Sequence, residues 1–151
     1  MTANSLWNTL RWRWTMWMDG APAEIRNGRP VVVEERLSTL RPVPLVVQPD
    51  AIYQTADGRL IVVETKTRGE WLVKRGDVVQ MSAVRAVVRH CDDPRLVGWP
   101  VAPYGYVRLV HGDRVIWEKV DLLPDAAVVN LWLAYWAANG RGMDGEMARA
   151  G

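Results

Sequence analysis

The stretch Gln48–Arg68, QPDAIYQTADGRLIVVETKTR, decides the fold, because a turn signal separates two segments of strand character. The Asp57-Gly58 pair is a strong signal for a tight hairpin turn. The segment that follows, RLIVVETKT, is rich in β-branched residues and ends in charged side chains. The sequence therefore predicts a β-hairpin with acidic and basic groups toward one end of its second strand.

Glu64 and Lys66 are predicted to project from the same face of that second strand, since side chains alternate along a strand. A two-residue turn at Asp57-Gly58 would set residue 51 opposite residue 64, so Asp50 would lie within one position of Glu64. A bulge, or a loop one residue longer, would bring Asp50 and Glu64 directly across from each other. The hairpin thus gathers two carboxylates and one amine.

Two carboxylates a few ångströms apart repel each other, and a divalent cation is the usual remedy. A site made of oxygen ligands without His or Cys suits Mg²⁺ or Mn²⁺ rather than zinc. The Lys66 amine would orient a water next to such a cation, for attack on phosphorus. In the alternative, Asp50 merely starts a strand after Pro49, and Glu64 pairs with Lys66 on a solvated face. The combination of Pro-Asp, hairpin, spacing and apolar run favours the site.

The remaining segments predict an α/β fold with a central mixed sheet flanked by helices. A helix is expected over residues 5–18, with Trp7, Leu10, Trp14 and Trp17 on one stripe. The other expected elements are a strand at RPVVVEERL (29–37), an extended segment at RPVPLVVQPDAIYQ (41–54), a helix at GDVVQMSAVRAVVRHC (76–91) with Asp77 as its N-cap, a hairpin of YGYVRLV (104–110) and RVIWEKV (114–120), and a helix over 125–139. In that last helix Val128, Leu131, Trp132, Tyr135 and Trp136 share a stripe, Asp125 caps the start and Gly140 stops it.

The 151 residues fit a single domain over residues 1–140, followed by a flexible C-terminal tail over residues 141–151. The net charge of +2 permits nucleic-acid binding without demanding it. The single cysteine, Cys91, excludes a disulfide framework and favours a reducing, cytoplasmic setting. Arg11 and Arg13 interrupt the N-terminal apolar residues, so no signal peptide is expected there. No segment of the sequence reaches the length of a membrane span, so none is expected.

The sequence PDAIYQTADGRLIVVETK resembles the signature of the PD-(D/E)XK nuclease superfamily: Pro49-Asp50, thirteen intervening residues, then Glu64-Thr65-Lys66. From VEERLS through ETKTR to VVQMSAVRAVV the chain is most similar to the RecB-like exonucleases, including the CRISPR-adaptation nucleases of that group. The resemblance covers roughly residues 31–120 and implies a restriction-endonuclease-like core. It implies that Asp50, Glu64 and the Thr65 backbone carbonyl ligate the metal and that Lys66 is catalytic. Gln80 matches the glutamine on the helix after the hairpin in these families.

The chain also departs from the RecB-like pattern. Val84 stands where the family has an aromatic residue, no histidine precedes the hairpin, and the iron–sulfur cysteines are missing, so no iron–sulfur cluster is expected. The candidates for an additional upstream acidic ligand are Glu24, Glu34 and Glu35. Because side chains alternate along a strand, only one of Glu34 and Glu35 is expected to face the cleft, and Glu34 is the preferred candidate.

The helix after the hairpin and the loop before it offer further candidates. Asp77 and Gln80 also have the spacing of a capping box, which is a purely structural role for Gln80. The basic loop is expected to bind DNA by gripping phosphates and stacking one base, through Arg68, Trp71, Lys74 and Arg75. The alternative is a solvated loop with Trp71 tucked into the core. Arg85 and Arg89 are expected to form a solvated helix face.

These observations predict a metal-dependent DNA nuclease of exonuclease type, acting in DNA processing, recombination or a phage or defence context. Two alternatives stay open: a Holliday-junction resolvase-like endonuclease, and a catalytically silent nuclease fold that binds or inhibits. DNA is the expected partner and a membrane is not. The Trp-rich N-terminal helix is a candidate contact with a second copy or a protein partner. The sequence does not decide whether the substrate is DNA or RNA, or whether cleavage occurs at ends or internally. It also leaves open the polarity of cleavage and the oligomeric state.

Overall fold

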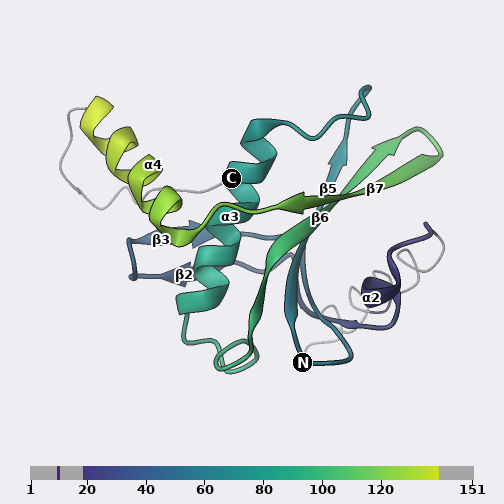
Figure 1. Cartoon of the computed structure of the whole chain (residues 1–151), viewed down its shortest axis with the longest axis horizontal. Helices are drawn as coiled ribbons and strands as arrows, with labels where there is room; N and C mark the ends of the chain where they lie inside the picture. The colour runs from purple at the N-terminus through teal and green to yellow at the C-terminus, as the bar shows by residue number, and fades with distance from the viewer. Residues whose placement is uncertain (1–9, 11–18, 140–151) are drawn as a thin grey trace.

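The computed structural model describes residue 10 and residues 19–139, and Figure 1 shows a sheet with helices packed around it. The helix expected over residues 5–18, the Gly140 stop and the tail over 141–151 lie outside the described residues, apart from Leu10. The elements, in order, are α2 (Ala23–Arg26), β1 (Arg29–Val33), β2 (Leu37–Thr39), β3 (Leu45–Val47), β4 (Ala51–Gln54), β5 (Leu60–Thr67), α3 (Arg75–His90), β6 (Val101–His111), β7 (Arg114–Asp121) and α4 (Asp125–Ala138).

The main sheet has five strands in the order β1-β4-β5-β6-β7, and this confirms the predicted α/β class with a mixed sheet. The pairs β1–β4, β4–β5 and β6–β7 are antiparallel, and the last two are hairpins. The pair β5–β6 is parallel, because α3 carries the chain back across one face of the sheet. The parallel pair and its crossover helix form the middle of the molecule (Figure 1).

The β4–β5 hairpin has the longer of the two loops considered from the sequence. The Thr55 amide donates to the Arg59 carbonyl at 2.8 Å, which leaves a three-residue loop, 56–58, between them. Gly58 ends this loop with φ of +92°, a left-handed conformation that glycine adopts without strain. Ala51 consequently pairs with Val63. The two-residue turn that would place residue 51 opposite residue 64 is therefore wrong.

Each face of the main sheet has its own apolar cluster. The face covered by α3 includes Leu60, Val62 and Met81, and the opposite face includes Ile61 and Val63. The alternation along β5 is therefore the predicted one, and it places residues 60, 62, 64 and 66 on the α3 face.

Close packing of α3 on the sheet depends on Gly105 in β6. A Cβ at this position would lie 2.7 Å from the Val62 carbonyl oxygen and 2.8 Å from the Met81 methyl group. Glycine is required here for space and not for backbone conformation, and it sets how near the helix lies to β5.

The predicted single strand over 29–37 is wrong, because the chain turns at Glu34. This residue has φ of +51°, and β1 has ended at Val33. The chain then forms β2, which pairs with β3 in a separate two-stranded sheet. Both of these short strands contact α3. The interruption releases the chain from the main sheet immediately before it re-enters at β4.

The helix caps also differ from the expected ones. Helix α3 begins at Arg75, and Asp77 is its third residue, whose carboxylate accepts the Lys74 amide at 2.8 Å. Asp77 therefore caps the helix from inside it, and the expected N-cap position and the capping box with Gln80 are wrong. In α4 Asp125 is the first helical residue and Pro124 the N-cap, which corrects the expected Asp125 cap.

The predicted stripe of α4 is only partly buried. Val128, Trp132 and Trp136 pack into the core, while Leu131 and Tyr135 are exposed. Within residues 19–139, no helix combines the length and the apolar character needed to cross a membrane.

Candidate active site

Asp50 and Glu64 lie opposite each other on the α3 face of the main sheet. Since Ala51 pairs with Val63 in the antiparallel hairpin, the same register sets residue 50 across from residue 64. Asp50 precedes the first residue of β4, and its Oδ2 accepts the backbone N–H of Thr65 at 2.7 Å. The Asp50 side chain thus continues the ladder beyond the start of β4 and is held beside Glu64.

Glu64 is a buried carboxyl group whose contacts do not fully offset the cost of its burial. Glu64 is only 2% exposed, and its Oε1 atom has no hydrogen-bond partner among the described residues. Burial raises the pKa of Glu64 to about 9, and repulsion from Asp50 and a side-chain hydrogen bond with Asp50 add to the rise, while Lys66 opposes it. A buried oxygen without a partner costs free energy, so this group is suited to a ligand that the polypeptide does not supply.

Lys66 lies two residues beyond Glu64 on the same face of β5, half-buried. Its Nζ donates to Oε1 of Gln80, on the second turn of α3, at 2.9 Å. The structure thus brings together the lysine and the glutamine that the sequence singled out separately. The hydrogen bond orients the ammonium group at the edge of the carboxylate pair and leaves two of its three N–H donors for other partners.

The donor set fits a hard divalent cation. Two carboxylates are what Mg²⁺ commonly takes from a protein, with waters and substrate phosphate oxygens filling the other positions. Thr65 adds a third oxygen, because the N–H and C=O of one strand residue point to the same side and its N–H faces Asp50. The unpartnered Glu64 oxygen lies within this set. Asp50, Glu64 and the Thr65 carbonyl are therefore the residues that would hold the cation.

The upstream acids do not join this pair. Within the described part of the chain, no three His, Cys, Asp or Glu side chains gather as a metal-holding group. Glu34 approaches Asp50 only through the backbone, since its N–H donates to the Asp50 carbonyl at 3.0 Å while its side chain is exposed. Glu35 pairs with Arg95 at 2.8 Å.

The third upstream candidate, Glu24, belongs to another polar cluster. Its carboxylate accepts the hydroxyls of Tyr104 and Tyr106 and pairs with Arg59 at 3.3 Å. Tyr106 packs in the cluster on the face away from α3. Glu24 therefore fastens α2 to the sheet on the opposite side from Glu64.

The four residues predicted to contact DNA have different environments. Arg68 is engaged within the protein, with its guanidinium against Asp77 at 2.7 and 2.9 Å and against the Leu72 carbonyl at 2.8 Å. Lys74 is exposed and pairs with Glu70 at 3.4 Å. The exposed Arg75 opens α3.

Trp71 is half-buried and packs against the α3-face cluster, as the structural alternative for this residue expected. Its ring also lies 5.6 Å from the His111 ring, and the Arg114 guanidinium lies 5.7 Å from its centroid. Sequence reasoning did not assign His111 or Arg114 to the site. The available signal was their place at the tip of the predicted β6–β7 hairpin, near the end of β5 in a parallel pair.

A second group of basic residues lies at the other end of α3. Arg85, Arg89 and His90 all approach Asp125 of α4, at 3.9, 2.6 and 2.7 Å. Arg85 also donates to the Ala102 carbonyl at 3.0 Å and is not a solvated side chain, which corrects the expected solvated face for this residue. These contacts attach α4 to α3.

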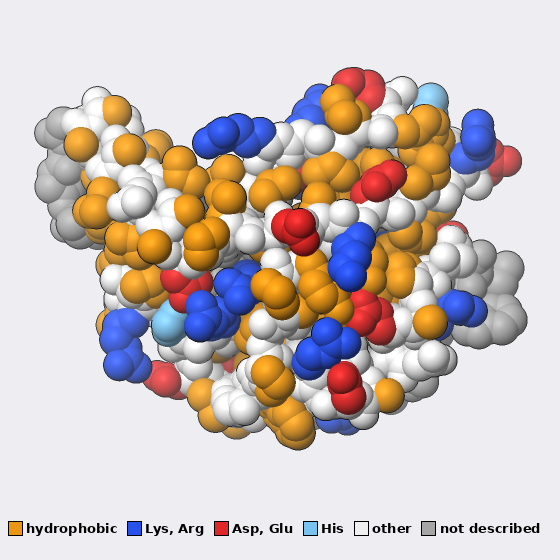
Figure 2. All heavy atoms as spheres, viewed as in Figure 1, with side chains coloured by type: hydrophobic (Ala, Val, Ile, Leu, Met, Phe, Trp, Pro, Cys, Tyr) orange, Lys and Arg blue, Asp and Glu red, His pale blue; other side chains and the backbone are white. Residues whose placement is uncertain are grey.

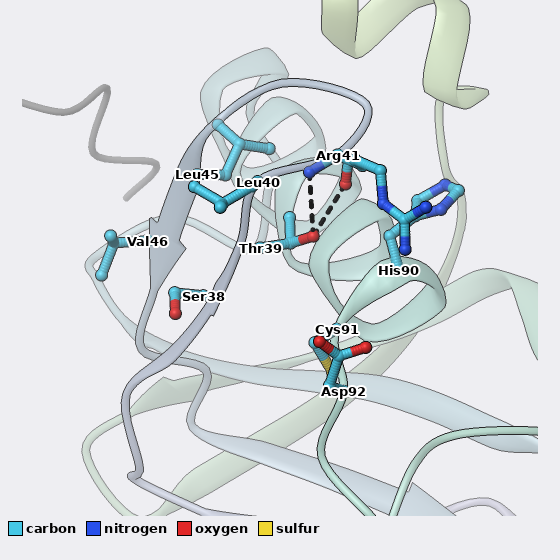
Figure 3. A pocket seen from close by; sticks show the side chains of 9 residues that line it. All are labelled: Ser38, Thr39, Leu40, Arg41, Leu45, Val46, His90, Cys91 and Asp92. Carbon is cyan, nitrogen blue, oxygen red and sulfur yellow. Dashed lines mark hydrogen bonds between the residues drawn. The ribbon is translucent and has the colours of Figure 1, made fainter.

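One hollow among the described residues lies away from the carboxylate pair. It measures about 420 Å³ and lies between the β2–β3 sheet and the C-terminal end of α3 (Figure 3). Its lining residues are Ser38, Thr39, Leu40, Arg41, Leu45, Val46, His90, Cys91 and Asp92. The Thr39 hydroxyl is engaged with the Arg41 backbone, donating at 2.8 Å and accepting at 3.2 Å (Figure 3). Because Asp50, Glu64, Lys66 and Gln80 are absent from this lining, the hollow is not part of the candidate active site.

Figure 2 shows acidic and basic side chains interspersed on the viewed face, with no extended surface of one sign. This distribution agrees with the small net charge of +2. On this face, a contact with a nucleic acid would therefore depend on a few placed groups more than on a broad basic surface.

No protein-family model matches the chain, and no curated protein matches it. Among solved structures, the one described as "Crystal structure of SSO0001" is similar over 93% of this chain, with 16% sequence identity and a TM-score of 0.43. The chain spans 60% of the length of that structure. Similarity of this extent assigns neither a family nor an activity to the chain.

Proposed function

We propose that the chain is a Mg²⁺- or Mn²⁺-dependent deoxyribonuclease that hydrolyses phosphodiester bonds, of exonuclease type. The observation that carries the proposal is the direct opposition of Asp50 and Glu64 on one sheet face, with a buried Glu64 oxygen lacking a partner and the Lys66–Gln80 pair beside them. Two carboxylates placed together beside an amine are parts that metal-assisted phosphodiester hydrolysis requires.

Asp50 and Glu64 would hold the cation from two adjacent strands, and Thr65 would add its backbone carbonyl. When bound, the cation would neutralise charge on the scissile phosphate and activate the attacking water. The N–H of Thr65 holds Asp50 in place, so that this ligand is positioned before any cation arrives. Positive charge at this point would also favour ionisation of Glu64, whose burial otherwise opposes it.

Lys66 would orient the attacking water and stabilise negative charge as it develops on phosphate oxygens. Gln80 accepts one of its N–H groups and thereby fixes the direction of the side chain. Gln80 is therefore a positioning residue, acting through Lys66.

The substrate class and the setting are supported by the resemblance and by composition. DNA and attack from a strand end are supported by the similarity of the run from VEERLS through ETKTR to VVQMSAVRAVV to RecB-like exonucleases, as is a role in DNA processing, recombination, or a phage or defence context. The single cysteine supports a cytoplasmic setting.

The test is cleavage of linear DNA in Mg²⁺ or Mn²⁺, with EDTA as the metal-free reference. Asp50→Asn, Glu64→Gln and Lys66→Met should each reduce the rate by at least about 100-fold, since each removes a group that acts on the transition state. Asp121→Asn is the matched control, because it neutralises an exposed carboxylate on β7. Equal cutting in EDTA, or full activity of the Lys66 variant, would show that the proposal is wrong.

Two further measurements separate the alternatives. Preference for four-way junctions over free ends would identify a resolvase-like endonuclease. Calorimetric titration with Mn²⁺ that shows no heat dependent on Asp50 and Glu64 would identify a catalytically silent fold.

A further inference from the structure

Trp71, His111 and Arg114 form a cluster at the end of the sheet where β5 ends and the β6–β7 hairpin turns. The Trp71 and His111 ring centroids are 5.6 Å apart with planes inclined by 47°, and the Arg114 guanidinium lies 5.7 Å from the Trp71 centroid. His111 and Arg114 are exposed, whereas Trp71 is half-buried beneath them. Two flat polar side chains thus lie against an indole that the protein core supports.

This cluster lies on the same sheet face as the candidate active site. Lys66 pairs with Leu109 in the parallel ladder, and His111 is two residues further along β6, so its side chain points to the same face. At about 3.3 Å per residue, it lies about 7 Å beyond Lys66 and one strand over. Arg114 is the cross-strand partner of His111, and it shares that face. In Figure 1 the β5–α3 connection and the β6–β7 tip both lie toward the upper right.

The loop that carries Trp71 is fastened at several points. The Arg68 N–H donates to the Val110 carbonyl at 3.1 Å, which extends the β5–β6 ladder into the loop. The Arg68 guanidinium holds the Leu72 carbonyl at 2.8 Å and the Asp77 carboxylate at 2.7 Å. The indole is therefore presented in a preorganised position, which lowers the entropic cost of binding to it.

Charge around the cluster is nearly balanced, so stacking is the main attraction that it offers. Lys74 is paired with Glu70, and Arg68 with Asp77. Arg114 then adds a cation next to the aromatic rings, opposed by the neighbouring Asp113 carboxylate. A partner suited to this surface has flat faces and modest negative charge, as an unpaired nucleotide does.

We propose that Trp71, His111 and Arg114 form a stacking platform for an unpaired base of a nucleic-acid strand that leaves the candidate active site. Bases stack on aromatic and guanidinium planes irrespective of sequence, and one phosphate can approach Arg114. The position of the platform beside a cutting site rests on the proposed function, while its affinity for single strands does not. It follows that the chain acts on single-stranded DNA or on ends that have been separated.

The test is binding without cleavage, measured in EDTA by fluorescence anisotropy. The probes are a labelled oligothymidylate of about ten nucleotides, a length that covers one site, and a blunt duplex of the same length. Arg114→Ala and His111→Ala change exposed side chains and leave the core intact. Trp71→Leu removes the indole, and Trp71→Tyr retains an aromatic plane.

Lys119→Ala is the matched control for Arg114→Ala. Lys119 lies on the same β6–β7 hairpin and also over an aromatic ring, with its Nζ 4.0 Å from the Tyr104 centroid. It pairs with Tyr106, so it points to the opposite face of the sheet. Its removal deletes one charge and one cation–π contact away from the platform.

Arg114→Ala and Trp71→Leu should each weaken binding of the oligothymidylate about tenfold, and duplex binding much less. Trp71→Tyr should recover most of the loss. Arg114→Ala should also reduce the slope of log affinity against log salt by about 0.7, the value for one phosphate contact on a single strand. Lys119→Ala should leave affinity and slope unchanged.

The platform is refuted if the wild type does not bind the oligothymidylate, if Arg114→Ala binds as tightly as the wild type, or if Lys119→Ala weakens binding equally. These results are separable from the nuclease test. If cleavage depends on Asp50 and Glu64, and Arg114→Ala changes neither cleavage nor binding, the platform is refuted and the nuclease proposal is retained. If binding depends on the platform but no cleavage occurs, the nuclease proposal is refuted and the platform is retained.

Discussion

Replacement of Glu64 by Gln should abolish a large pH dependence of the stability of the metal-free protein. Gln has nearly the same shape as Glu and never ionises, so Glu64→Gln isolates the cost of charging this one buried group. The cost arises because the folded protein raises the pKa of Glu64 from 4.5 to about 9. The raised pKa means that the fold favours the neutral carboxyl group over the carboxylate.

The sign and size follow from proton linkage. A group with a raised folded pKa contributes stability that is fully present below its unfolded value of 4.5 and is lost as the pH rises toward about 9. Within that window the free energy of unfolding falls by about 1.4 kcal/mol per pH unit. Between about pH 5.5 and pH 8.5 the wild type should lose about 4 kcal/mol, which is a large part of the total stability of a small domain.

The assay is urea unfolding in EDTA across this pH range, for the wild type and Glu64→Gln. Carboxylates with lowered pKa values, such as Asp77 and Asp93, change protonation below the window and leave the slope unaffected. The wild-type midpoint should fall steadily with rising pH, while that of Glu64→Gln stays nearly level.

Addition of Mn²⁺ at the alkaline end extends the same experiment. A cation held at about 100 times its dissociation constant adds about 2.7 kcal/mol to the stability of a protein that binds it only when folded. The wild type should regain this amount and Glu64→Gln should regain much less. Parallel pH profiles for the two proteins in EDTA would refute the reasoning, because they would show that ionisation of Glu64 carries no cost.

Three other outcomes follow from the described contacts. Gly105→Ala should lower the free energy of unfolding by about 1–3 kcal/mol in urea titration, since its methyl group would lie 2.7 Å from a backbone oxygen of β5; an unchanged midpoint would contradict this packing. Asp77→Ala should cost about 3 kcal/mol in the same assay, because it removes the α3 cap and leaves Arg68 without its partner, and a loss below about 0.5 kcal/mol would mean that the pair is solvated. Gln80→Ala should lower kcat of DNA cleavage about tenfold with little change in KM, because Gln80 only orients Lys66; a change confined to KM would assign Gln80 to substrate binding.

The central hairpin could be predicted because its signals are local. The turn at Asp57-Gly58 and the alternation of β5 lie within a few residues of each other. The register was not decided by the sequence, because residues 51–53 and 60–63 are all apolar and their faces are known only from the structure. A two-residue turn would pair Ile52 with Val63, which belong to opposite faces of the sheet. Paired residues share a face, so only the longer loop keeps both strands in phase.

The failures came from contacts between distant residues. Nothing near Glu34 marks the turn that ends β1, because a positive φ at a glutamate depends on the surrounding structure. The pairing of Arg68 with Asp77 of the next helix was also not indicated by the sequence. The His111–Trp71 contact likewise exists only because β6 runs parallel to β5.

The parallel pairing of β5 with β6 has a consequence for how such a chain can diversify. Every side chain of the candidate active site comes from the continuous segment between Asp50 and Gln80, whose internal spacing the hairpin and the crossover helix set. Insertions at the β6–β7 tip or between β2 and β3 would lengthen the protein without altering that spacing. The architecture therefore keeps the candidate active site separate from the β6–β7 tip and the β2–β3 connection, and each can vary while the other is retained.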